Sequence, residues 1–169
     1  QCQGKRLKPA ALAVTTANLS IDKIVEMPIS QAQEFFKDAG DRMSANELKI
    51  VGLIVKEILN RLQFLIDVGL DYLTLDRKAD TLAGGEEQRI RLASQIGSKL
   101  TGILYILDEP SIGLHPRDQG KLIETIKKLK NLGNTVVVVE HAPPTIMAAD
   151  WRIDVGPKAG KHGGRITFE

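Results

Sequence analysis

Two short segments, about twenty residues apart, most constrain what this chain can fold into. Residues 82–88 place a glycine pair, Gly84 and Gly85, at the start of an amphipathic helix. Residues 103–110 form an apolar run that ends in adjacent carboxylates, Asp108 and Glu109. A helix that begins with glycines presents bare N–H groups to an anion, and an apolar strand of an α/β sheet presents polar side chains at its carboxyl end. The pair of segments predicts a phosphate-handling α/β protein.

The two carboxylates have separable roles in such a site. Consecutive strand residues point to opposite sides, so Asp108 can reach a Mg²⁺ shell while Glu109 faces an attacking water. The alternative is a pair of surface carboxylates that begin a turn before Pro110. The aliphatic run before them argues against that alternative.

A histidine and a glycine-containing loop complete the candidate site. His141 follows a second apolar run, residues 135–140, and a histidine at the end of a neighbouring strand can contact a γ-phosphate or orient water. Ser111 and Gly113 lie in the loop after the carboxylates, where glycine permits close backbone approach. The alternatives are a structural histidine and an ordinary turn. His115 is a candidate for a contact between subunits or between halves of a protein, and His162 for an exposed loop residue.

Composition excludes several classes of protein. A share of 43% hydrophobic and 26% charged residues in 169 is typical of soluble globular chains of one domain or two small lobes. The apolar runs are too short to span a bilayer, and no secretory leader opens the chain. A net charge of +2 favours no class of partner, and a lone cysteine, Cys2, excludes an internal disulfide framework. Because Gln1 is not a natural start residue, we expect a piece of a longer protein.

The periodicity predicts helices first and a strand–helix–strand unit afterwards. We expect short strands within residues 11–27 and a helix that Ser30 and Gln33 cap and that runs through Phe36. Ser44 and Glu47 predict a second capping box, followed by a core-facing helix that stops at Gly69. Further helices are expected over residues 85–96 and 117–132, and parallel strands over 103–107 and 135–140, the latter covered on both faces. Residues 165–168 predict a last short strand after a glycine-rich loop.

The phosphate loop G-x-x-x-x-G-K-[ST] does not occur anywhere in the sequence. The lysines that follow a glycine, Lys5, Lys121 and Lys161, lack the upstream glycine and the downstream hydroxyl. The chain alone is therefore expected not to hydrolyse ATP.

Four stretches together resemble the UvrA family, the damage-sensing ABC-type ATPase subunits of the bacterial UvrABC excinuclease. They are residues 72–77, the glycine pair with residues 88–93, residues 107–115 with their S-I-G-L-H sequence, and residues 153–157. The resemblance extends from Cys2 through nearly the whole chain, and matches the later part of that family's first ATPase half. It implies an α/β fold in which residues 1–100 form a mainly helical signature domain, with the end of a zinc-binding region at its start. Residues 101–169 would form part of a parallel, P-loop NTPase-like core without its Walker A portion.

The resemblance also implies site residues and partners. Asp108 would be the magnesium-associated Walker B aspartate, Glu109 the catalytic base and His141 the switch histidine. Gly84, Gly85 and Glu86 would cap ATP held by the other half, Ser111 and Gly113 would belong to the D-loop, and Cys2 would bind Zn²⁺. The intact family member would be a cytoplasmic homodimer without a membrane segment that binds damaged double-stranded DNA, loads UvrB in nucleotide excision repair and belongs to the SOS response.

Two residues depart from the family pattern. Ala83 replaces a serine whose hydroxyl would donate to the γ-phosphate, a bond worth about 1.5–3 kcal/mol. Ala142 replaces the aspartate that usually follows the switch histidine.

Other functions remain open on the sequence alone. The chain could belong to a transporter or translation-factor ABC ATPase, or to a degenerate half that only senses nucleotide. The basic residues Lys5, Arg6, Lys8, Lys56 and Arg61 are candidates for contacts with DNA phosphate, with a solvated surface as the alternative reading.

Overall fold

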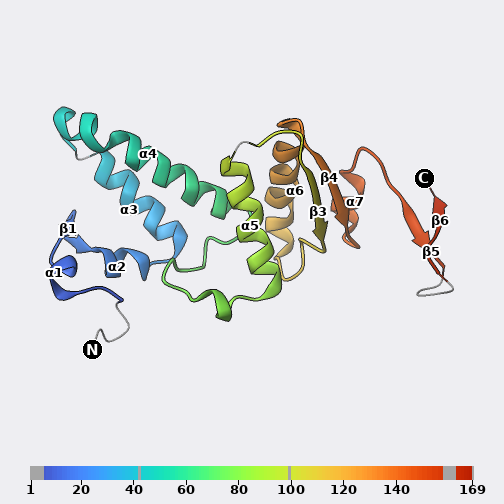
Figure 1. Cartoon of the computed structure of the whole chain (residues 1–169), viewed down its shortest axis with the longest axis horizontal. Coiled ribbons are helices and arrows are strands. Elements are labelled where there is room, and N and C mark those ends of the chain that lie inside the picture. The colour runs from blue at the N-terminus through green and yellow to red at the C-terminus, as the bar shows by residue number, and fades with distance from the viewer. Residues whose placement is uncertain (1–5, 42, 99, 158–162, 169) are drawn as a thin grey trace.

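In the computed structural model, which describes residues 6–41, 43–98, 100–157 and 163–168, helices come first and the parallel strands follow. Figure 1 shows the elements arranged along one axis, with β5 and β6 extended away from the rest. The first part contains α1 (Pro9–Leu12), β1 (Thr15–Thr16), β2 (Leu19–Ser20), α2 (Ile21–Val25), α3 (Ile29–Asp41), α4 (Ala45–Asp67), the 3-10 turn η1 (Ala79–Thr81) and α5 (Gly84–Ser98). The second contains β3 (Leu104–Asp108), α6 (Pro116–Asn131), β4 (Thr135–Val139), α7 (Pro143–Met147), β5 (Asp154–Gly156) and β6 (Arg165–Phe168).

The long helix α4 begins and ends where its sequence predicts. The Ser44 hydroxyl accepts the Glu47 N–H, and the Glu47 carboxylate accepts the Ser44 N–H at 2.8 Å, which completes the capping box. At the other end Gly69 adopts a φ of 75°, the left-handed conformation that terminates helices at glycine. The carbonyl of Asp67 then accepts a bond from the Thr125 hydroxyl, which joins this end to α6.

One local prediction for the first part of the chain is wrong, and another holds only in part. Helix α3 begins at Ile29 rather than at a Ser30 cap, because the Ile29 and Ser30 N–H groups donate to the carbonyls of Leu73 and Asp71. Tertiary contacts therefore replace the expected side-chain cap. Only two-residue strands form within 11–27, around a turn at Ala17 and Asn18, and residues 21–25 form a helix instead.

The apolar stripe of α4 is buried along only part of its length. Leu62 is buried and Ile58 half-buried, as a core-facing stripe requires. Ile54, together with its neighbours Ile50 and Leu53, is exposed. The prediction that the stripe is core therefore fails towards the N-terminal half of α4, where α3 covers one side of the helix and nothing described covers these three.

Strands β3 and β4 pair in parallel, as predicted. Leu104 pairs with Thr135 and Asp108 with Val139, so both strands end at the same edge. Asn134 fixes this register from the opposite end: it accepts the Ile103 N–H and donates to the carbonyls of Leu100 and Leu129. A buried amide with three satisfied bonds joins the starts of both strands to the end of α6.

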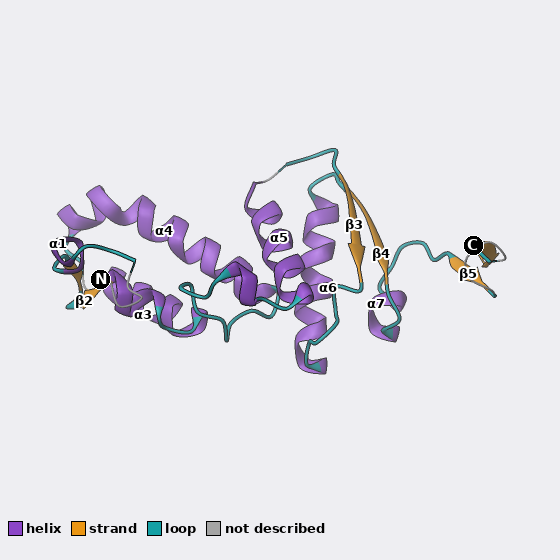
Figure 2. Cartoon of the chain, turned by 60° about the horizontal axis from the view of Figure 1, so that its bottom comes forward, coloured by secondary structure: helices purple, strands orange, loops and turns teal. Residues whose placement is uncertain are grey.

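Only one face of this two-stranded sheet is covered in the part of the chain that the structure describes. Leu107 and Val136 belong to the core, whereas Leu104, Ile106, Val137 and Val139 are exposed. The prediction of a strand covered on both faces is therefore wrong for β4. In Figure 2, α6 and α5 lie together beside the sheet. The mixed α/β class expected from the sequence is confirmed.

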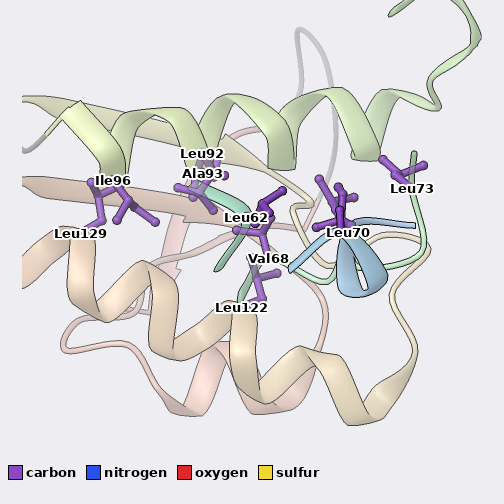
Figure 3. Packing of buried hydrophobic residues seen from close by; sticks show 12 residues of the cluster. Leu62, Val68, Leu70, Leu73, Leu92, Ala93, Ile96, Leu122 and Leu129 are labelled. Carbon is purple, nitrogen blue, oxygen red and sulfur yellow. The ribbon is translucent and has the colours of Figure 1, made fainter. Parts of the chain in front are cut away.

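The core lies where α4, α5 and α6 meet β3. Figure 3 shows Leu62, Leu92 and Leu122 converging from these three helices around Val68 and Leu70. Leu70 and Leu122 are fully buried. Burial of each such leucine contributes about 1.5–3 kcal/mol, so this shared cluster holds the helical part against the sheet.

Candidate functional site at the carboxyl ends of the parallel strands

The paired ends of β3 and β4 bring the predicted catalytic residues together. The Glu109 N–H donates to the Val139 carbonyl at 2.9 Å, which extends the sheet pairing by one residue. Glu109 has a φ of 44°, in the left-handed region that non-glycine residues adopt at a cost of about 1–2 kcal/mol. Strained residues of this kind cluster at functional sites, which favours a role for Glu109 beyond packing.

The side chains of Glu109 and His141 meet across this edge. The Glu109 Oε1 lies 3.4 Å from the His141 Nε2, and both side chains are accessible to solvent. A pocket of about 210 Å³ opens beside them, lined by Glu109, Ser111, Ile112, Glu140, His141 and Ala142. Three predicted site residues, Glu109, Ser111 and His141, thus share one concave surface.

Glu140 belongs to this site although the sequence analysis did not single it out. Its Oε1 accepts the Ser111 N–H at 3.0 Å. Its Oε2 accepts the N–H groups of His141 at 2.9 Å and Ala142 at 3.1 Å. Partial burial raises the pKa of Glu140, but the hydrogen bonds from Ser111, Ala142 and His141 outweigh it and leave the pKa below its usual value. The only sequence signal for the involvement of Glu140 in this site is its position directly before His141.

The loop formed by residues 110–115, called loop 110–115 below, turns the chain from β3 into α6. Pro110 is fully buried, and Gly113 has a φ of 73°, which glycine adopts without strain. His115 caps α6: its Nδ1 accepts the Arg117 N–H at 3.2 Å. The proposed contact of His115 with another half or subunit stays a prediction, and His162 lies outside the described residues.

The two glycines at the start of α5 have different surroundings. Gly84 has open space where a side chain would be. A Cβ on Gly85 would lie 2.9 Å from the Ile112 Cγ2 and 3.2 Å from the Ile112 carbonyl oxygen. The buried Arg89 donates to that same carbonyl at 2.9 Å. Helix α5 is therefore packed directly against loop 110–115 at Gly85, whereas the space beside Gly84 is open. The predicted contacts of both glycines with ATP stay predictions.

Glu86, the third signature residue, is committed to contacts within the chain. It is buried, and its carboxylate accepts the Tyr72 hydroxyl at 2.6 Å and the Ala83 N–H at 2.8 Å. Arg77 lies 3.4 Å from it. The Tyr72 hydroxyl first, then the Ala83 N–H and the guanidinium charges, hold the pKa of Glu86 below its usual value against the opposing effect of burial. These contacts give Glu86 a structural role at the helix start, and its predicted contact with ATP stays a prediction.

The predicted role of Asp108 as a magnesium ligand stays a prediction. No cluster of three or more acidic, histidine or cysteine side chains able to hold a metal occurs among the described residues. Mg²⁺ does not need such a cage, because it keeps several waters and commonly uses one or two carboxylates with substrate phosphates. Asp108 is exposed at the end of β3, next to the pocket residue Glu109.

Other predicted binding residues are less informative. Cys2, the zinc candidate, and Lys5 lie outside the described residues. The Arg6 guanidinium donates to the Asp76 carbonyl, and Arg61 pairs with Glu57 on its own helix. These contacts account for the two arginines locally, and DNA contacts of the basic residues stay a prediction.

Comparison with known proteins gives high similarity along the whole chain. The chain is 59% identical over 169 residues to UvrABC system protein A of Aquifex aeolicus, and 58% identical over 168 residues to that of Rickettsia conorii. The chain matches one stretch of the UvrA proteins along its whole length. It spans 18% of the length of each of these two relatives. No protein-family profile matches it.

A solved structure of the UvrA family has the same fold. The crystal structure of UvrA2 from Deinococcus radiodurans matches 99% of this chain with a TM-score of 0.90 at 40% identity, and the match covers 22% of that protein. The arrangement of helices and parallel strands described above is thus the arrangement of one stretch of a UvrA protein. Within the described part of the chain, no helix combines the length and apolar character that a membrane crossing requires.

Proposed function

We propose that this chain supplies the signature, Walker B, D-loop and switch-histidine elements of an ATPase that acts in the recognition of damaged DNA. One observation carries the proposal: the side chains of Glu109 and His141 meet at 3.4 Å where two parallel strands end. A base and an imidazole at one sheet edge, beside an exposed aspartate, suit the activation of water and the binding of magnesium in nucleotide hydrolysis, whereas the phosphate loop must come from another part of the protein.

Each residue has a defined task in this proposal. Glu109 accepts a proton from the attacking water at its carboxylate, and His141 orients that water from the opposite side. Asp108 holds magnesium, which when bound neutralises charge on the phosphates of ATP. The exposed position of Glu109 and His141 leaves room for the nucleotide to arrive from outside the chain.

The start of α5 contributes in a second way. Gly84 presents the helix N-terminus, which favours an anion, and no neighbouring atoms fill the space beside it. We assign this end to the γ-phosphate of an ATP held by the other ATPase half. Gly85 contacts loop 110–115 instead, so it keeps the signature end next to the D-loop residues Ser111 and Gly113.

The wider role follows from the family. We propose that the intact protein is a cytoplasmic homodimer that binds damaged double-stranded DNA, loads UvrB in nucleotide excision repair and binds zinc through residues that include Cys2. The identity to UvrABC system protein A along the whole chain supports this role.

The test replaces the matching stretch of the Aquifex aeolicus relative with this chain, with the other ATPase half of that relative silenced. We expect the graft to hydrolyse ATP and to bind damaged duplex DNA in a nucleotide-dependent manner. Glu109→Gln should retain ATP binding but lower turnover by roughly 10²–10⁴-fold, because an amide cannot accept the proton. Glu124→Gln, an exposed control on α6, should leave turnover unchanged.

The outcomes separate the alternatives. A graft that binds ATP without turning it over would make this half a degenerate nucleotide sensor, a reading that the missing hydroxyl at Ala83 favours. Hydrolysis without any response to DNA damage would favour a transporter or translation-factor ATPase. Unchanged turnover in Glu109→Gln would exclude Glu109 as the base.

A further inference from the structure

The carboxylate of Glu140 connects two loops that come from different strands. Loop 110–115 follows β3, and residues 141–142 follow β4. Oε1 of Glu140 accepts from Ser111 in the first loop, and Oε2 accepts from His141 and Ala142 in the second. One side chain therefore satisfies three backbone donors and divides its two oxygens between the loops.

We propose that Glu140 is a positioning residue that ties loop 110–115 to the backbone of His141, so that the His141 imidazole stays opposite Glu109. Bonds from N–H groups to a carboxylate are roughly twice as strong as neutral ones, which suits a fixed geometry at an otherwise open edge. Glu140 does not touch the reacting atoms in this proposal. It acts through the backbone of its neighbours.

The same loop is held from its other side. Arg89 of α5 donates to the Ile112 carbonyl, one residue after the Ser111 N–H that Glu140 accepts. Loop 110–115 thus lies between an arginine of the signature helix and a glutamate of the histidine strand. Glu140 completes a continuous path from the signature helix to the Glu109–His141 pair.

The chemistry of the side chain makes the inference testable. A carboxylate has two acceptor oxygens, whereas glutamine has one acceptor and one donor of nearly the same shape. Glu140→Gln can keep the bond to one loop but must place its NH₂ group against the N–H donor of the other. The connection between the loops is lost while the volume of the side chain is preserved.

The first experiment uses the chain itself and does not depend on the proposed function. Backbone amide shifts of Ser111, His141 and Ala142 and the imidazole ring signals of His141 are followed by NMR in Glu140→Gln and in the control Glu124→Gln. We expect Glu140→Gln to shift the amides in both loops and to move the ring signals of His141. An effect confined to residues 141 and 142, with Ser111 unchanged, would overturn the connection.

The second experiment rests on the proposed function and uses the full-length graft. Misplacement of catalytic groups by about 1 Å costs on the order of 100-fold in rate, so Glu140→Gln should lower kcat by roughly 10- to 100-fold with little change in KM. Glu140→Asp keeps the charge and should recover part of kcat. Normal kcat in Glu140→Gln, or a loss that matches the unfolded fraction, would overturn the proposal. Absence of turnover in the unsubstituted graft would instead count against the proposed function, and the NMR result would then decide the role of Glu140.

Discussion

At the residue scale, Ala83 and Glu86 form half of a capping box at the start of α5. The Glu86 carboxylate accepts the Ala83 N–H, but alanine has no hydroxyl to accept the Glu86 N–H in return. Ser-x-x-Glu is the sequence that completes such a box. Position 83 is therefore a test point for two separable roles, helix capping and the proposed contact with nucleotide.

Ala83→Ser tests which of them applies. The added hydroxyl should raise the free energy of unfolding of the chain by about 1 kcal/mol, because it completes the cap. If Ala83 also faces ATP, the full-length graft should show roughly tenfold tighter ATP-dependent closure, measured as ATP affinity and turnover. A gain in stability without any change in affinity or turnover would leave Ala83 as a cap position only.

The lowered pKa values of Glu86 and Glu140 predict a loss of stability in acid. A glutamate whose pKa is lower in the folded state contributes stability that is complete above its unfolded value, about 4.3, and is lost as the pH falls through the folded value. Tyr72→Phe removes the main cause of the shift at Glu86. It should cost about 1.5–3 kcal/mol at neutral pH and flatten the acid dependence.

Urea unfolding measures this effect when it is followed from about pH 3 to about pH 7, a range that spans the ordinary pKa of glutamate. Tyr105→Phe is the matched control, because its hydroxyl bonds the neutral Gln95 at 3.5 Å. An equally steep acid dependence in Tyr72→Phe and in the unsubstituted chain would contradict the assignment.

At the element scale, the contact between α5 and loop 110–115 joins the helical part to the sheet edge. It consists of the Gly85 backbone against Ile112 and of the Arg89 bond to the Ile112 carbonyl. Because a backbone atom opposes Gly85, a side chain there has no easy way to be accommodated. The contact explains one of the two signature glycines by packing alone.

Gly85→Ala and Gly84→Ala form a matched pair that tests this contact. Each replacement gains up to about 1 kcal/mol of helix propensity. At Gly84 the space is open, so the chain should keep that gain, whereas at Gly85 the new Cβ forces α5 away from Ile112. We expect Gly85→Ala to be less stable than Gly84→Ala by roughly 1–3 kcal/mol in thermal or urea unfolding. Equal stability of the two variants would show that α5 does not depend on close contact with the loop.

At the scale of the whole molecule, the described part of the chain is an extended row of elements with an apolar sheet face exposed to solvent (Figure 1). The proposed catalytic edge has a carboxylate, an imidazole and an aspartate, and the sequence contains no phosphate loop. In the proposed function, binding of ATP therefore depends on groups that this chain does not contain.

The chain by itself should show no magnesium-dependent ATPase activity above background. Glu109→Gln should not change this baseline, which a phosphate-release assay measures with the full-length graft as the positive control. Robust turnover by the chain alone, abolished by Glu109→Gln, would overturn the assignment of the phosphate grip to another part of the protein.

The sequence by itself determined the elements whose signals are local. The Ser44–Glu47 box, Gly69 and the aliphatic runs before Asp108 and His141 specify their helix and strand ends through neighbouring residues, so their boundaries followed from the pattern. Parallel pairing then brings Glu109 and His141 together, because parallel strands end at the same edge. The proximity of Glu109 and His141 was predictable for this reason, and their catalytic role stays a proposal.

Tertiary structure decided what depends on residues far apart in the chain. The start of α3 is set by the carbonyls of Asp71 and Leu73, and the surroundings of Gly85 by Ile112. The role of Glu140 depends on Ser111, twenty-nine positions away, whose N–H only the folded loop brings within 3.0 Å. No periodicity or motif encodes such contacts, because they exist only once packed helices and strands have fixed where each backbone donor lies.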